Sequence, residues 1–409
     1  MKPASIMLLA GEPSGDVLAA ELVRALRPRL IAAADQPDAA VQPLHTALAP
    51  RFFGAGGPRM QAADVELAFD LTQHSVIGVF EVLRKYADFR RLFRQLVALA
   101  RERQPDVIVG VDYGGFNLRF ARAIRALTRR QSGPFNNWRP RLVQFVSPQV
   151  WASRPGRATR MAEDLDLLLC IFPFEPVWYA RHAPKLHVEF VGHPMLDRYP
   201  EAASGIRPPV SGLRHPPPPP ELLLLPGSRR AELQRHLPVM LDALKLIRQK
   251  LPTLAATMVL PDEDFVRRAA ELGVPSSVRV QSGKLTEALT RATVALSKTG
   301  TVTMECACFG VPTVTLYKAS WSLYQIGKRV VSVPTLTMPN LLADEMVFPE
   351  FIQDAATPAA LAEATLALLT DEPRRLAIQA KLRRVVASLG GPGAAGRAAD
   401  AIVRLLEPS

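Results

Sequence analysis

Polar residues follow short apolar runs in this chain, in the pattern that places side chains at the carboxyl edge of a parallel sheet. The first run, Ile6–Ala10, is followed by Gly-Glu-Pro-Ser-Gly-Asp, which ends at Asp16. Its glycines let the backbone pass close to a ligand, and Ser14 or Asp16 can cap the helix that follows. Glu12 would lie where open α/β sheets bind their ligands. A capped turn without any ligand fits the same residues.

A second acidic residue follows the apolar run Asp106–Val111, in the segment Asp112-Tyr-Gly-Gly-Phe-Asn117. Partial burial raises the pKa of a carboxyl group toward neutral pH, which suits a general base. Asp112 is therefore a candidate base at the same edge of the sheet as Glu12. A turn-forming aspartate is the alternative interpretation.

The next run ends in a segment that combines an aromatic residue with arginines. Ser147, Trp151 and Arg154 lie within Phe145-Val-Ser-Pro-Gln-Val-Trp-Ala-Ser-Arg-Pro-Gly-Arg157. Arginine forks and an aromatic face suit a phosphate or a sugar. A loop anchored by a tryptophan in the core fits these residues equally well.

Two further glycine turns occur in the second half of the chain. Leu222–Leu225 leads into Pro-Gly-Ser-Arg, with Gly227, Ser228 and Arg229, and a later turn is Ser297-Lys-Thr-Gly-Thr-Val-Thr-Met-Glu305. A strand, a small turn and the free N–H groups of a helix start make a phosphate site, and arginine adds a bidentate fork. A glutamate one turn into such a helix can bind ribose hydroxyls. The two turns together predict a nucleotide site in the second half.

One predicted helix carries an apolar stripe bordered by arginines. Its apolar residues recur at spacings of 3, 4, 3 and 4, with two more alongside: Val79, Val82, Tyr86, Phe89 and Phe93, then Phe80 and Leu83. Such a helix can lie on an anionic membrane surface. An amphipathic helix packed on its own domain has the same pattern.

Positive charge is the unusual feature of the composition. The chain of 409 residues has 50 Lys plus Arg against 38 Asp plus Glu, a net charge of +12, and 40 of the basic residues are Arg. Residues 113–162 contain ten Arg and no acidic residue. An excess of this kind favours anionic partners. Coding composition accounts equally well for the total, but less readily for so long a stretch without acid.

The order of the elements predicts two α/β domains. Short apolar runs alternate with helical patterns, as expected of parallel sheets covered on both faces. The expected parts are an N-terminal domain over 1–205, a proline-rich linker over 206–221, a second domain over 222–375 and a helical C-terminal segment over 376–409. No apolar run approaches the ~20 residues needed to span a bilayer. The N-terminus is expected to be a strand, not a signal peptide, and three scattered Cys fit a reducing cytoplasm.

Several segments together resemble those of lipid-A-disaccharide synthase, an inverting glycosyltransferase of the GT-B architecture. The resembling segments occur in the family's order and span residues 10 to about 353: Ala10–Asp16, Gly56–Met60, Gly78–Leu83, Val111–Asn117, Val146–Arg157, Phe172–Glu175, Phe190–Asp197, Leu224–Arg229, Gly300–Glu305, Pro339–Leu342 and Phe348–Gln353.

The resemblance implies two Rossmann-like parallel-sheet domains facing a cleft, and a reaction. The family joins UDP-2,3-diacylglucosamine to the 6-hydroxyl of 2,3-diacylglucosamine 1-phosphate, which gives a β-1,6 disaccharide 1-phosphate and UDP. Asp112 is the family's proposed base, and Glu12 is expected to position hydroxyl groups. The residues expected to bind the donor are Gly227, Ser228, Arg229, Gly300, Thr301, Glu305 and Asn340. Those expected at the acceptor or in the cleft are Ser14, Asn117, Ser147, Trp151, Arg154 and His193.

Two segments depart from the family pattern. The family usually has Asp-Ala-Pro-Asp-Phe-Asn where this chain has Asp-Tyr-Gly-Gly-Phe-Asn over 112–117, so its second carboxylate is missing here. The usual Ser-Gly-Thr turn is replaced by Ser297-Lys-Thr-Gly-Thr301, which leaves open which hydroxyl meets phosphate.

The expected setting is the cytoplasmic face of the bacterial inner membrane, with peripheral attachment and neither cofactor nor metal. The C-terminal helices can pack on their own first domain or swap between chains in a homodimer. The alternatives are a UDP-N-acetylglucosamine epimerase of the same architecture and a basic nucleic-acid-binding protein. The second lacks a reader motif and aromatic residues among its arginines, so no nucleic acid is expected as partner.

Overall fold

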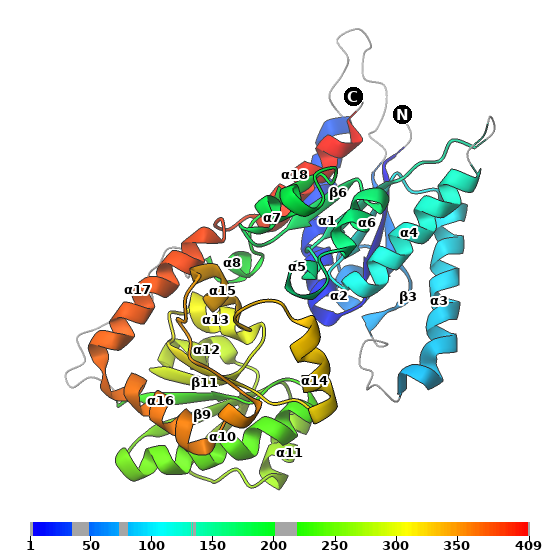
Figure 1. The fold of residues 1–409 in the computed structure, drawn as a ribbon. Coiled ribbons are helices and arrows are strands. Elements are labelled where there is room, and N and C mark those ends of the chain that lie inside the picture. Colours follow the sequence, from blue (N-terminus) through cyan, green and yellow to red (C-terminus); the bar gives the residue numbers. More distant parts are fainter. Residues whose placement is uncertain are drawn as a thin grey trace. The chain divides into compact units, whose positions relative to one another are not determined.

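The computed structural model describes residues 3–34, 49–72, 81–131, 133, 136–200 and 219–407, with the side chains of residues 34 and 81–88 left out. The chain forms two compact units. The first contains Met1–Asp197 together with Gly390–Ser409, and the second contains Arg198–Leu389. Each unit is built on one parallel sheet (Figure 1).

The first unit has a seven-stranded parallel sheet in the order β3-β2-β1-β4-β5-β6-β7. Its strands are β1 (Ser5–Ala10), β2 (Arg51–Gly56), β3 (Glu66–Asp70), β4 (Val107–Val111), β5 (Arg141–Phe145), β6 (Leu167–Cys170) and β7 (Val188–Phe190). Every residue of β1 and β4 is buried, because helices cover both faces of a parallel sheet. The continuous apolar runs of the sequence are these central strands.

Helices follow the strands of the first unit. They are α1 (Pro13–Ala34), α2 (Pro58–Gln61), α3 (Glu81–Arg103), α4 (Gly114–Gln131), α5 (Val150–Ser153), α6 (Arg157–Asp164), α7 (Glu175–His182), α8 (Met195–Arg198) and α18 (Ala394–Leu406). The helix α1 begins at a proline, whose fixed φ suits a first helical turn. The carboxylate of Asp16 accepts hydrogen bonds from the N–H groups of Gly57, Arg59 and Met60. Asp16 therefore caps α2 and not, as the sequence suggested, its own helix.

The second unit has a six-stranded parallel sheet in the order β10-β9-β8-β11-β12-β13. Its strands are β8 (Glu221–Leu225), β9 (Ala255–Leu260), β10 (Arg279–Ser282), β11 (Val294–Lys298), β12 (Thr313–Tyr317) and β13 (Glu350–Ile352). Its helical elements are α10 (Arg230–Lys250), α11 (Glu263–Glu271), α12 (Leu285–Arg291), α13 (Val302–Cys308), α14 (Trp321–Val330), α15 (Met338–Ala343), the short 3₁₀ helix η2 (Gln353–Ala355), α16 (Pro358–Thr370) and α17 (Glu372–Ser388). Leucines of β8 pack with β9, α10 and α16 into a single core.

Both sheets reverse their strand order at one point. The first three strands of each unit run outward in one direction, and the fourth strand lies on the other side of the first, between β1 and β4 and between β8 and β11. Such a switch point leaves a crevice at the carboxyl ends of the two strands, where open α/β sheets bind ligands. The two predicted Rossmann-like domains are confirmed, and each has one such point.

The last helix belongs to the first unit. It lies alongside α1, so the red and blue helices are neighbours in Figure 1. The carboxylate of Asp197 accepts hydrogen bonds from the N–H groups of Gly393, Ala394 and Ala395 and thereby caps α18. The ion pair between Arg29 and Asp400, 2.5 Å long, joins the two helices.

The boundaries between the two units lie at other residues than the sequence predicted. Residue 376 lies inside α17, which packs on α13 and α15 of the second unit. The helical run ends only at Gly390, Gly391 and Gly393, whose φ values of 87°, 70° and 98° are left-handed. Most of the proline-rich linker, 206–218, lies outside the described residues, and so does the loop over 35–48.

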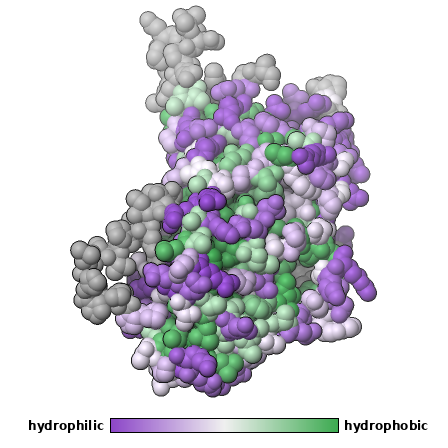
Figure 2. Space-filling view, turned by 60° about the vertical axis from the view of Figure 1, so that its left-hand side comes forward, coloured by the Kyte–Doolittle hydropathy of each residue, from purple (hydrophilic) through white to green (hydrophobic). Residues whose placement is uncertain are grey.

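Among the described residues, no helix is long and apolar enough to cross a membrane. Figure 2 shows one face of the molecule, on which hydrophilic residues are interspersed with smaller apolar patches.

The helix with the apolar stripe is α3. Val79 and Phe80 lie outside the described residues, as do the side chains of Val82, Leu83 and Tyr86. The ring of Phe89 packs edge-on against Phe116 of α4, with ring centroids 5.3 Å apart. Phe89 therefore contributes to the packing of its own unit, as the alternative interpretation expects of an amphipathic helix, and it does not support the membrane-facing role.

Candidate active site

The switch point of the first sheet brings Ser14 and Asp112 together. Ala10 at the end of β1 is paired with Val111 at the end of β4, so the two turns that follow begin side by side. The hydroxyl of Ser14 donates a hydrogen bond to Oδ2 of Asp112 over 3.3 Å. Two candidates from segments almost a hundred residues apart in sequence thus meet at the predicted edge of the sheet.

The backbone of Asp112 has a conformation that few residues adopt. Asp112 and Tyr113 have φ values of 51° and 43°, in the left-handed region, which costs of order 1–3 kcal/mol for a residue other than glycine. The N–H of Asp112 donates to the carbonyl of Phe145 at the end of β5 over 2.9 Å. A strained backbone of this kind persists only where neighbouring residues hold it. The same neighbours therefore fix the position from which the Asp112 carboxylate extends.

Two buried amides hold the carbonyl of Asp112. Nδ2 of Asn117 and Nε2 of Gln144 each donate to this oxygen over 2.9 Å. Asn117 is 3% exposed, so its side chain positions the backbone of the site. The sequence analysis expected it to contact the acceptor sugar, which a buried side chain does not reach. Gln144 was missed, although a polar residue in a buried strand was a usable signal.

The turn after β1 lies against Tyr113. A side chain at Gly11 would come within 2.2 Å of Cδ1 of Tyr113, so glycine lets the tyrosine ring pack over this turn. Burial raises the pKa of Tyr113, and the negative charge of Glu12 raises it further. Glu12 is thus near Tyr113, the residue next to the candidate base.

The loop after β5 is anchored by a buried network. Glu175, which is fully buried, accepts hydrogen bonds from Nε1 of Trp151 and from the N–H of Phe172, each over 3.0 Å. Ser147 shares a hydrogen bond of 2.9 Å with the hydroxyl of Tyr179. Burial raises the pKa of Glu175 to about 7. Ser147 and Trp151 therefore anchor the loop and do not line an open site, which corrects their assignment to the acceptor.

The remaining two acceptor candidates of the first unit, Arg154 and His193, differ in their exposure to solvent. Arg154 is exposed directly after α5. His193 is 8% exposed, and its Nδ1 accepts a hydrogen bond from the N–H of Met195 over 3.1 Å. His193 therefore shapes the turn before α8, whereas Arg154 remains available to a ligand.

The second unit has a pocket of about 320 Å³ at its own switch point. The pocket is lined by residues at the ends of β8, β9 and β11 and by residues that follow β8, β9, β10 and β11: Leu225, Gly227, Ser228, Val259, Leu260, Pro261, Gly283, Leu285, Lys298, Thr301, Val302 and Glu305. Four of the predicted donor residues are in this set. Two predicted glycine turns thus form one concave site.

A lysine that the sequence analysis did not single out provides the cation of this pocket. Nζ of Lys298 lies 3.1 Å from Oε1 of Glu232, and Oε2 of Glu232 accepts a hydrogen bond from the N–H of Ser228. Gly227 and Gly300 have φ values of 125° and 156°, and a side chain on either would collide with this ion pair. Lys298 is part of the predicted turn Ser-Lys-Thr-Gly-Thr, but its partner Glu232 lies in a helix 66 residues away in sequence.

The structure indicates which hydroxyl of the 297–301 turn faces a ligand. Ser297 is fully buried and donates to the carbonyl of Lys298, and Thr299 donates to the carbonyl of Leu316. Thr301 is exposed and lines the pocket. The hydroxyl of Thr301 is thus the one open to the pocket.

Glu305 lies one turn into α13 at the side of the pocket. The hydroxyl of Tyr199 donates a hydrogen bond of 3.2 Å to Oε1 of Glu305. Burial raises the pKa of Glu305. A partly buried carboxylate with one oxygen held by a tyrosine can accept two further hydrogen bonds from neighbouring hydroxyl groups.

His236 of α10 positions the first turn of the pocket. Its Nδ1 lies 3.0 Å from the carbonyl of Pro226, and its Nε2 accepts from the N–H of Lys318 over 3.0 Å. These partners require a neutral ring with the proton on Nδ1, and burial lowers the pKa of the imidazole accordingly. No sequence pattern indicated this role of His236.

Three predicted donor residues, Arg229, Gly300 and Asn340, are not among those that line the pocket. The side chain of Arg229 is 80% exposed and 3.9 Å from Glu232. Asn340 is 1% exposed, with its Nδ2 donating to Phe348 and Glu350 and its Oδ1 accepting from the N–H groups of Val347 and Phe348. Asn340 therefore fixes the loop between α15 and β13, which engages both polar atoms of its side chain.

Comparisons with known proteins agree with the sequence resemblance. The family model described as lipid-A-disaccharide synthetase matches residues 6–401. A lipid-A-disaccharide synthase of Alkalilimnicola ehrlichii is 36% identical over 403 residues, which is 97% of each chain.

Solved structures with the same fold include enzymes of two kinds. The calicheamicin glycosyltransferase CalG4 has a TM-score of 0.57 at 16% identity, with 100% of each chain covered. The UDP-GlcNAc 2-epimerase of Neisseria meningitidis, bound to UDP-GlcNAc, has a TM-score of 0.54 at 12% identity, with 99% of each chain covered.

Proposed function

The chain belongs to the lipid-A-disaccharide synthetase family, and we propose that Asp112 and the pocket of the second unit carry out the family's reaction. The chain is a glycosyltransferase with the GT-B fold. It transfers a 2,3-diacylglucosamine unit from its UDP derivative to the 6-hydroxyl of 2,3-diacylglucosamine 1-phosphate, and it forms the β-1,6 disaccharide 1-phosphate of lipid A synthesis and UDP.

Asp112 is the general base of this proposal. Its carboxylate takes the proton of the acceptor's 6-hydroxyl while that oxygen attacks the anomeric carbon from the face opposite UDP, so the configuration inverts. The observation that carries the assignment is the position of Asp112 at the switch point, in a turn held by Asn117 and Gln144. Glu12 and Ser14, at the same edge, position the acceptor's hydroxyl groups.

The pocket of the second unit binds the UDP part of the donor. Lys298 and the N–H groups of the turn at Gly300 and Thr301 bind the diphosphate, and Glu305 binds the ribose. Negative charge develops on the diphosphate as the glycosidic bond breaks, and a fixed cation stabilises that charge in the transition state. Nζ of Lys298 lies close to the turn at Gly300, which supports its role as the cation that binds the diphosphate. Arg229, exposed at the start of α10, can join the diphosphate only after its side chain turns toward the pocket.

Replacing Glu305 with Ala is expected to weaken UDP binding by about 10- to 100-fold. A hydrogen bond to a charged group contributes roughly 1.5–3 kcal/mol, and the ribose loses such bonds in this variant. Titration calorimetry with UDP and with 2′-deoxy-UDP measures the effect. The wild-type chain should bind the deoxynucleotide less tightly than UDP, whereas the variant should bind the two alike.

The control for Glu305 is the variant Tyr199→Phe. It removes only the hydroxyl that donates to Glu305, so it should retain most of the preference for UDP over 2′-deoxy-UDP. A Glu305→Ala variant that still discriminates between the two nucleotides would show that the ribose binds elsewhere.

The proposed location of the enzyme is the cytoplasmic face of the bacterial inner membrane, to which it attaches peripherally. Both substrates carry acyl chains, so they are presented at a lipid surface, while the nucleotide is water-soluble. The net charge of +12 favours a surface of anionic lipids. A homodimer with exchanged C-terminal helices stays a prediction.

The epimerase alternative shares the fold but not the family. Mass spectrometry of the products separates the two: the diacylated donor and acceptor should give a disaccharide phosphate and UDP. Conversion of UDP-N-acetylglucosamine to its epimer, with the acylated substrates unchanged, would refute the transferase assignment.

A further inference from the structure

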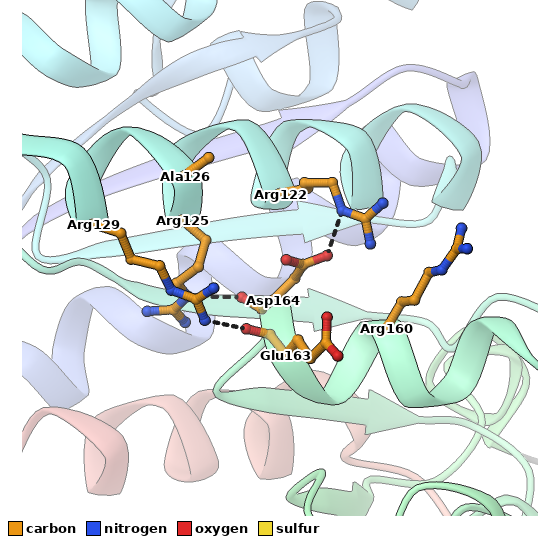
Figure 3. A pocket seen from close by; sticks show the side chains of 7 residues that line it. All are labelled: Arg122, Arg125, Ala126, Arg129, Arg160, Glu163 and Asp164. Carbon is orange, nitrogen blue, oxygen red and sulfur yellow. Dashed lines mark hydrogen bonds and ion pairs between the residues drawn. The ribbon is translucent and has the colours of Figure 1, made fainter.

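An arginine-lined groove of about 440 Å³ lies between α4 and α6 on the first unit, outside the candidate active site. Figure 3 shows its side chains, with the guanidinium groups of Arg122 and Arg160 at one end and those of Arg125 and Arg129 at the other. Glu163 and Asp164 lie between them.

Only some of these arginines are neutralised. Arg122 pairs with Asp164 over 3.1 Å, and Arg125 pairs with Asp166 over 2.6 Å. Arg129 donates to the carbonyl oxygen of Glu163, over 3.4 Å, and among the described residues its charge is not paired with a carboxylate.

The cationic surface extends beyond the groove. The pKa of Arg157 is lowered by local desolvation and by the positive charges of Arg154, Arg119 and Arg160. In the part of the chain that the structure describes, none of these four side chains forms an ion pair with a carboxylate. Cations that repel one another without a counter-charge bind an anion favourably.

These residues form one continuous face. The exposed residues Arg119, Arg122, Arg129, Arg154, Arg157 and Arg160, called the arginine face below, come from α4, from α6 and from the position directly after α5. The α4 members share one side of the helix, and at 1.5 Å per residue the ten steps from Arg119 to Arg129 span about 15 Å. A single phosphate group is much smaller than this face.

We propose that the arginine face binds the phosphate headgroups of an anionic lipid bilayer and so docks the first unit on the membrane. This inference rests on the proposed work at a membrane surface. A bilayer presents many phosphates in one plane, which matches a face about 15 Å long. Arg154 follows β5 at the sheet edge that holds Asp112, so lipids bound here lie on the acceptor side.

A nucleic acid also presents repeated phosphates, but the surroundings favour lipid. Proteins that bind single strands place aromatic rings between their cations for base stacking. The aromatic residues of α4, Phe116 and Phe120, are 4% and 1% exposed and pack into the core. A lipid surface needs only the charges.

Vesicle binding by the full chain tests the arginine face. The variant R119Q/R129Q/R160Q removes three of its charges without breaking an ion pair in the described structure. The control R374Q/R383Q/R384Q removes three exposed arginines from α17 in the other unit. On mixed phosphatidylcholine–phosphatidylglycerol vesicles, the first variant should bind about 100-fold more weakly than wild type and the control should bind nearly normally.

Each other outcome counts against the inference in a distinct way. Equal binding by the first variant and wild type, or an equal loss in the control, shows that this face is not the lipid site. No binding of wild type to these vesicles refutes the proposed membrane attachment itself. Weak vesicle binding together with tight, salt-sensitive binding to a DNA oligonucleotide, lost in the first variant, assigns the face to nucleic acid. Disaccharide formation in detergent, measured on the same preparations, tests the transferase independently.

Discussion

Replacement of Asp112 by Asn is expected to lower turnover by a factor of about 10²–10⁴, the usual contribution of a general base. The amide has nearly the same shape but cannot take the proton of the acceptor's hydroxyl. Asparagine also tolerates the left-handed conformation that residue 112 adopts, with its φ of 51°. The fold should therefore survive, and the loss should fall on the chemical step.

Two measurements make the Asp112 result specific. UDP affinity should be unchanged, because the pocket that binds UDP belongs to the other unit. The matched control is Asp106→Asn, directly before the same strand, where among the described residues the carboxylate accepts from the N–H of Ser5 and the amide oxygen can replace it. A nearly normal rate in Asp112→Asn, or an equal loss in Asp106→Asn, contradicts the assignment of the base.

The central strands and their turns could be predicted from sequence because both signals are local. A fully buried parallel strand reads as a continuous apolar run, and Ile6–Ala10 lies within β1. The residue after such a run is bound to lie at the carboxyl edge. This reasoning placed Glu12 and Asp112 at one edge, and the structure brings Ser14, two residues after Glu12, to Asp112.

The roles of individual side chains were harder to predict, because partners distant in sequence decide them. Trp151 and Asn117 have the residue types of a sugar site, but Glu175 and the carbonyl of Asp112 engage them inside the unit. Lys298 was not singled out, because its partner Glu232 is distant in sequence and the fold brings the two together. The apolar stripe of α3 that contains Phe89 was ambiguous for a related reason. Apolar residues have the same helical spacing whether they face a protein core or a membrane surface.

Replacement of Glu175 by Ala is expected to reduce the free energy of unfolding by roughly 2–6 kcal/mol. The substitution leaves two buried donors, Nε1 of Trp151 and the N–H of Phe172, without an acceptor, and each costs about 1–3 kcal/mol. Urea denaturation followed by tryptophan fluorescence measures the loss. The matched control is Glu163→Ala, which removes an exposed carboxyl of α6 and should change stability little.

The pH dependence of this loss identifies its cause. Burial raises the pKa of Glu175 from 4.5 to about 7, so the unfolded chain gives up this proton at a lower pH than the folded one. The stability that Glu175 contributes is then complete below pH 4.5, falls as the pH rises and levels off above about pH 7. The penalty of Glu175→Ala should accordingly be larger at the acidic end, by roughly 3 kcal/mol at most. A penalty that is the same at both ends would mean that folding leaves the pKa of Glu175 unchanged, and that the loop after β5 is not anchored by a desolvated carboxyl.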